Sequence, residues 1–162
     1  MNNLRFFILL ISLLIITCIF YLYELFPLKY IDLIPNSSFD KLLILSIIKV
    51  ESSFKTNAIS NVGAYGLMQV LPSTAEWINN KFNTNYNLKV PKDNILLGIT
   101  YLEYLYNITK DLQKTISYYN TGPNASDEIV KTAGLNYYNK IMKAYSLYKF
   151  LYRSDNYEIS NK

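Results

Sequence analysis

One carboxylate in this chain occupies a position where its surroundings could hold a proton near neutral pH. Glu51 follows an apolar run over residues 42–50, which predicts a helix buried on most of its surface. Burial raises the pKa of a carboxyl group, and donors from the small-residue loop that follows can hold either protonation state. Such a group suits general acid catalysis. The alternative is a solvated charge at a helix end, because acidic residues are rarely buried without a partner.

The residue types present exclude several other chemistries. The 162 residues contain no histidine and one cysteine, Cys18. Ser-His-Asp and Cys-His catalysis are therefore excluded, as are an intrachain disulfide and a cysteine-rich zinc site. We expect neither a metal ion nor a cofactor. Carboxylates, hydroxyls, amides and aromatic rings remain, and cleavage of glycosidic bonds uses these groups.

The stretch from Val50 to Gln69 carries a longer pattern. It contains E-S-x-F, then A-x-S, then G-A-x-G-L-M-Q. This pattern resembles the catalytic signature of the soluble lytic transglycosylases, lysozyme-like enzymes that cut peptidoglycan. One position departs from it, since Thr56 stands where a proline is common. The resemblance implies an all-α, lysozyme-like helical domain.

Two later segments are similar to the same family. Asn94 is followed by apolar residues, Gly98 and then Tyr-Leu, and we expect Gly98 to permit close packing against the catalytic helix. Tyr119 and Asn120 match the family's A-Y-N-A-G segment, with Tyr118 in place of the first alanine. The Glu-Thr pair that often precedes the closing helix falls at residues 133 and 134, which are Ala-Gly here, so no role is carried onto them.

The resemblance implies a mechanism with a single carboxylate. Glu51 would donate its proton to the oxygen that links N-acetylmuramic acid to N-acetylglucosamine. The acetamido group would support positive charge at C1, which removes the need for a second carboxylate. Glu51 would then accept the proton of the C6 hydroxyl as a 1,6-anhydro ring closes.

The resemblance also implies substrate-binding residues. Ser60 and Tyr119 would direct their hydroxyls at Glu51 or at the acetamido group, while Met68, Gln69 and Asn120 would line the groove around the scissile bond. For Gln69 and Asn120 the alternative is helix capping and backbone hydrogen bonding.

Three other functions remain open. A goose-type lysozyme would share the fold but deliver water. A non-catalytic module would bind the cell wall, and the intact Glu51 argues against it. A small membrane protein would only dock partners.

Residues 6–23 contain no charged side chain. As a helix they span roughly 27 Å, close to the hydrocarbon thickness of a bilayer. With Arg5 before them, the positive-inside tendency predicts a single-pass cell-membrane protein with its catalytic domain on the extracytoplasmic side. A cleaved signal peptide would require small residues after a shorter apolar core, and a lipoprotein would require a small residue before Cys18, where Thr17 stands.

The chain therefore divides into two parts. We expect residues 1–30 to form a cytoplasmic stub, the membrane anchor and a juncture, and residues 31–162 to form the lytic transglycosylase-like domain. Asp40, Ser37 or Ser38 is expected to cap the helix that ends at Glu51, and Ser73 with Glu76 reads as a capping box. Further helices are expected over 74–82, 91–107, 112–120, 126–131 and 135–151, with a polar, frayed tail from residue 154. On the 91–107 helix the spacing predicts core positions at Ile95, Ile99, Leu102 and either Leu105 or Tyr106.

The charge pattern limits the partners. The formal net charge is +4, and the lysines are scattered rather than clustered, so nucleic-acid binding is not expected. The predicted partners are peptidoglycan glycan strands and, through residues 6–23, the membrane. We expect a monomer.

Overall fold

The computed structural model describes residues 2–152, and every regular element within that range is helical. The all-α prediction is therefore confirmed, while the predicted tail from residue 154 lies outside the described residues. In chain order the elements are α1 (Asn2–Leu25), η1 (Ile31–Leu33), α2 (Lys41–Ser52), α3 (Pro72–Phe82), α4 (Pro91–Thr109), α5 (Leu112–Thr121), α6 (Asp127–Ile129), η2 (Val130–Gly134) and α7 (Leu135–Tyr152).

The buried helix of the domain is α2. Asp40 caps it, since its Oδ1 accepts a hydrogen bond of 2.8 Å from the backbone N–H of Leu42, which confirms one of the three predicted caps. Ile44, Leu45 and Ile48 are fully buried, and each such side chain contributes about 1.5–3 kcal/mol to folding. This helix packs against α7, so its carboxyl end is held inside the domain.

The predicted capping box of α3 is wrong. The helix begins at Pro72, its N-cap is Leu71, and no side chain caps it. Proline is favoured at the first helical position because its fixed φ suits the helix and its missing N–H has no intrahelical acceptor there. Ser73 therefore lies inside the first turn instead of before it.

The later helices enclose the site. On α4 the expected core positions Ile95, Ile99, Leu102 and Leu105 are buried, and α4 packs against both α3 and α5. Ser126 caps α6 through a bond from the N–H of Ile129. The predicted short helix near 126–131 does not end there, because the π-helical segment η2 joins α6 directly to α7.

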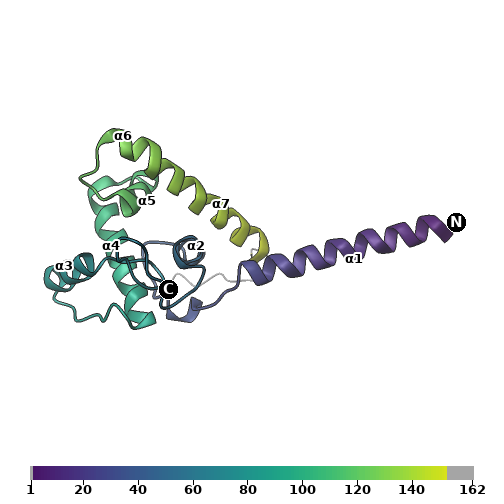
Figure 1. Cartoon of the computed structure of the whole chain (residues 1–162), viewed down its shortest axis with the longest axis horizontal. Helices are drawn as coiled ribbons and strands as arrows, with labels where there is room; N and C mark the ends of the chain where they lie inside the picture. The colour runs from purple at the N-terminus through teal and green to yellow at the C-terminus, as the bar shows by residue number, and fades with distance from the viewer. Residues whose placement is uncertain (1, 153–162) are drawn as a thin grey trace.

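The first helix stands apart from the rest. Residues Leu4–Leu25 form one helix long and apolar enough to cross a membrane, with a mean hydropathy of 2.7 and no fully buried residue in its most apolar stretch. Figure 1 shows α1 projecting from the domain, with its carboxyl end beside the last turns of α7. The juncture that follows is not a free linker, because Phe26, Leu28 and Leu33 pack against the hydrophobic core.

Candidate active site

The site is built on the loop over residues 53–71, which links α2 to α3. Ser53 and Phe54 both have positive φ, 48° and 65°, so the chain reverses immediately after α2. The buried hydroxyl of Ser52 donates to the carbonyl oxygen of Leu67, 2.8 Å away. Short backbone pairings join Ile59 to Tyr65 and Tyr65 to Val70. These contacts fold the loop back over the end of the helix that carries Glu51.

One buried amide fixes this loop to α4. Oδ1 of Asn94 accepts a 2.9 Å bond from the N–H of Met68, and its Nδ2 donates to the carbonyls of Tyr65 and Leu88 at 2.9 and 3.1 Å. Asn94 is 1% exposed. Gly66 has a φ of +82°, and a Cβ there would lie 2.4 Å from Nδ2 of Asn94, so both its backbone and its neighbour require glycine.

Two expectations about this region need correction. Gly98 does permit a close contact, but with the loop rather than with the catalytic helix, since a Cβ there would lie 2.4 Å from Sδ of Met68. The Met68 side chain is fully buried and is not among the described residues that line the cavity beside Glu51. Met68 contributes to the site through its backbone instead of lining the groove.

Glu51 lies at the carboxyl end of α2 and is half-buried. Burial raises the pKa of its carboxyl group from 4.5 to about 7, although a hydrogen bond from Tyr137 acts in the opposite direction. That bond runs from the Tyr137 hydroxyl on α7 to Oε1 of Glu51, 2.5 Å away. A carboxyl group of this pKa keeps its proton over part of the neutral range and can act as an acid and then as a base.

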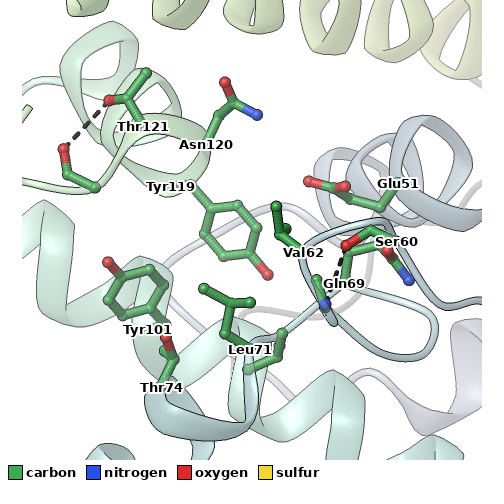
Figure 2. Close-up of a pocket in the computed structure, with 13 residues that line it drawn as sticks. Glu51, Ser60, Val62, Gln69, Leu71, Thr74, Tyr101, Tyr119, Asn120 and Thr121 are labelled. Atoms are coloured by element: carbon green, nitrogen blue, oxygen red, sulfur yellow. Dashed lines mark hydrogen bonds between the residues drawn. The ribbon is translucent and has the colours of Figure 1, made fainter.

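Glu51 lines a cavity of about 350 Å³. Figure 2 shows its carboxyl group and Ser60 at one side of this cavity and Asn120 and Thr121 at another, with the rings of Tyr119 and Tyr101 between helices α5 and α4. Apolar walls come from Val62, Ala64, Val70 and Leu71. Among the described residues that line the cavity, Glu51 carries the one carboxylate.

Four of the five predicted binding residues line this cavity: Ser60, Gln69, Tyr119 and Asn120. The Ser60 hydroxyl oxygen accepts a 3.0 Å bond from the N–H of Ala64, so its own proton is not used in that bond. The amide nitrogen of Gln69 donates to the carbonyls of Ala58 and Gly66, which matches the structural alternative for this residue. Asn120 is exposed on the cavity wall.

The tyrosine hydroxyl that is bonded to Glu51 is not the one expected from the sequence. The Tyr119 hydroxyl donates to the carbonyl oxygen of Met68 at 2.8 Å, while Tyr137 is the residue bonded to Glu51. Burial first, and then the neighbouring Glu51 charge, raises the pKa of both phenols, so both remain donors. Sequence reasoning missed Tyr137 because it lies 86 positions from Glu51 among several tyrosines of similar pattern.

The described residues form a helical domain in which one carboxyl group of raised pKa faces a cleft with polar and apolar walls. These features define the class of lysozyme-like helical domains. Within that class, the family described as "Transglycosylase SLT domain" matches residues 34–142. The chain belongs to this family, which confirms the resemblance of the 50–69 stretch.

Individual relatives agree with the family assignment. The chain is 39% identical to a "Membrane-bound lytic murein transglycosylase C" of Haemophilus influenzae and 38% identical to one of Histophilus somni, and each match covers 60% of this chain. The chain spans about a third of the length of these curated relatives, since 32% of each is covered.

Solved structures show the same fold. The 70 kDa soluble lytic transglycosylase of Escherichia coli superposes with a TM-score of 0.71 at 26% identity, covering 83% of this chain and 26% of that one. A complex of the 70 kDa soluble lytic transglycosylase with bulgecin A superposes with a TM-score of 0.73 at 25% identity, over the same shares of the two chains.

Proposed function

We propose that this protein is a peptidoglycan lytic transglycosylase. It cleaves the β-1,4 bond between N-acetylmuramic acid and N-acetylglucosamine and leaves a 1,6-anhydro end. The observation that carries the proposal is the half-buried Glu51 carboxyl group, with a pKa of about 7, facing the 350 Å³ cavity. The names of the relatives and of the solved structures support the same substrate.

Glu51 is the proton donor in this proposal. Its proton passes to the bridging glycosidic oxygen, the bond to C1 breaks, and the positive charge at C1 is shared with the acetamido oxygen of the same sugar. Among the described residues that line the cavity, Glu51 is the one carboxylate, and this supports the substrate-assisted route, because the usual two-carboxylate mechanism needs a second acid across the scissile bond.

Ring closure follows on the same sugar. The C6 hydroxyl oxygen attacks C1 while its proton passes to the ionised Glu51, so the enzyme regains its starting state. The Tyr137 hydroxyl stabilises the carboxylate between the two proton transfers through its bond to Oε1. Holding the C6 hydroxyl near C1 replaces attack by water, and such positioning supplies a large part of the rate increase.

The remaining lining residues bind the substrate. We assign Ser60, Gln69, Tyr119 and Asn120 to the sugars on either side of the scissile bond, because all four residues line the same cavity as Glu51. Met68 acts indirectly, as the acceptor that orients the Tyr119 ring.

The proposed location is the cell membrane, with α1 as an uncleaved single-pass anchor and the catalytic domain, residues 31–162, on the extracytoplasmic side. Contacts of the end of α1 with the domain favour retention of the anchor, since the Tyr23 hydroxyl donates to the carbonyl of Leu151. A monomeric state is part of the same proposal.

Two glutamine variants of the full chain test the catalytic assignment. Glu51→Gln keeps the shape of the side chain but removes the proton donor, and we expect lysis of purified cell walls to fall by at least about a thousandfold, as for removal of other essential catalytic groups. Glu76→Gln makes the same chemical change at an exposed position on α3, and it should lyse walls at the unaltered rate. Normal lysis by Glu51→Gln rejects the proposal in favour of a non-catalytic module.

A further inference from the structure

The end of α1 is attached to the end of α7 by a joint, which we define as residues 23–27 together with 148–152. The Tyr148 hydroxyl donates to the carbonyl of Pro27 at 3.0 Å, and the Tyr152 hydroxyl donates to that of Phe26 at 2.7 Å. In the other direction, Tyr23 donates to the carbonyl of Leu151 at 3.0 Å. The carbonyl of Leu151 is in the last turn of α7, where a helix leaves carbonyls without intrahelical donors, and those of Phe26 and Pro27 follow the end of α1.

Aromatic packing stiffens the joint. The rings of Phe26 and Tyr148 meet edge to face with centroids 5.4 Å apart, and those of Tyr23 and Tyr152 meet in the same way at 5.4 Å. Nζ of Lys49, on α2, lies 5.4 Å from the centre of the Phe26 ring. Three elements therefore hold one short segment, and these contacts restrict rotation of the domain about the end of α1.

Phe150 points out of this joint. The Phe150 side chain is 75% exposed, whereas Tyr148 and Leu151, which face the end of α1, are buried. Phe150 directly precedes the residue whose carbonyl binds Tyr23, so it lies at the level where α1 leaves its apolar span. Tyr21 and Tyr23 are also exposed at that level, and aromatic side chains are enriched where a membrane meets water.

Polar side chains near Phe150 suit a lipid headgroup layer. Lys149 is exposed on the last turns of α7, and Lys29 is exposed just after the joint. Lysine side chains at this depth reach lipid phosphates while their alkyl stems remain in apolar surroundings. Glu24 is the exposed acidic group on the same turns of α1, so the local charge is only mildly positive and the aromatic side chain must supply most of the attraction.

We propose that the carboxyl end of α7 docks on the phospholipid bilayer that α1 spans, with Phe150 inserted among the lipid headgroups. This inference rests on the proposed membrane anchor. Docking also limits how far from the membrane the site can act. Tyr137, which touches Glu51, lies thirteen residues before Phe150 on α7, or roughly 20 Å along the helix. The substrate is then peptidoglycan glycan close to the membrane surface, because the rigid joint keeps the site from more distant layers.

Spin-label depth measurements on the full chain test the docking. The background is Cys18→Ser, which removes the one native cysteine, and nitroxide labels are attached to Phe150→Cys or Asn139→Cys in phosphatidylcholine and phosphatidylglycerol nanodiscs. Asn139 is exposed and lies eleven residues earlier, on the same face of α7 about 16 Å further from the joint. It is therefore a matched control.

Docking predicts a ratio of oxygen to nickel-chelate accessibility several-fold higher at position 150 than at 139. Equal, water-like ratios at both positions overturn the proposal, and so does spin–spin broadening at 150, which indicates a second copy of the chain on this surface.

Cell-wall lysis by the same labelled chains is measured in parallel. Lysis with position 150 in water contradicts only the docking, whereas a buried label without lysis contradicts only the proposed catalytic function.

Discussion

At the scale of single residues, the chemistry depends on the balance between burial and one hydrogen bond at Glu51. Burial favours the protonated acid, and the Tyr137 hydroxyl favours the carboxylate, with burial as the larger effect. The resulting pKa of about 7 lets one group serve as acid and then as base, which a single-carboxylate mechanism requires.

Replacing Tyr137 by phenylalanine tests this balance. The change removes the donor that lowers the pKa of Glu51, so the pH at which activity is lost on the alkaline side should move upward. The maximal rate should fall about tenfold, because the ionised carboxylate loses a charge-assisted bond between the two proton transfers. The measurement is the pH profile of wall lysis.

Tyr138→Phe, on the neighbouring position, is the control, and its profile should match that of the unmodified chain. An alkaline limb that stays in place or moves to lower pH in Tyr137→Phe contradicts the account of the Glu51 pKa.

The same pKa predicts a pH-dependent cost to stability. Between pH 4.5 and about 7 the folded chain holds a proton on Glu51 that the unfolded chain releases, so this group destabilises the fold increasingly as pH rises and costs up to about 3 kcal/mol above pH 7. Glu51→Gln removes the cost. Denaturant unfolding of the detergent-solubilised chain should show the variant to be more stable at pH 8 and equally stable at pH 4.

Glu76→Gln is again the control, since an exposed side chain should change stability at neither pH. A Glu51→Gln variant that is less stable than the unmodified chain at pH 8 contradicts the raised pKa.

At the scale of elements, the site depends on how the 53–71 loop is fastened between α2 and α4. Asn94 alone makes three hydrogen bonds to this region and its surroundings, and Ser52 ties the loop to the end of α2. The Tyr119 hydroxyl adds a bond from α5. The loop has little regular structure of its own, so these side chains determine where Ser60 and Gln69 lie.

Replacing Asn94 by alanine should therefore loosen the loop. The change leaves the buried N–H of Met68 without its acceptor and removes one donor from each of the carbonyls of Tyr65 and Leu88, which costs about 2–4 kcal/mol. Chemical denaturation measures the loss, and wall lysis should fall with it. Asn80→Ala, at an exposed position on α3, should change neither property, and equal stability of the two variants contradicts the role of Asn94.

The helices with strong local sequence signals could be predicted from the sequence. The apolar run before Glu51 and the spacing of Ile95, Ile99 and Leu102 predicted buried helix faces, because periodicity reports burial directly. It failed where two local rules competed: Ser73 with Glu76 matches a capping box, but Pro72 begins the helix instead. It also failed for Met68 and Tyr137, since the direction of a side chain depends on contacts between segments far apart in the chain.

At the scale of the whole molecule, α7 connects the chemistry to the proposed membrane surface. Near its start Tyr137 touches Glu51, and at its end Tyr148 and Tyr152 bind the segment that follows α1. Figure 1 shows α7 running from α6 to the end of α1. The helix therefore contributes to the pKa of Glu51 through Tyr137 and, in the proposed account, fixes the distance of the site from the membrane anchor.

Product analysis in oxygen-18 water tests the central claim most directly. The full chain digests purified peptidoglycan in this solvent, and mass spectrometry identifies the new muramic acid ends. Attack by the internal C6 hydroxyl predicts 1,6-anhydro ends, lighter by one water and without the heavy isotope, and none of them with Glu51→Gln. Reducing ends that carry oxygen-18 at C1 would show that water is the nucleophile and contradict the account.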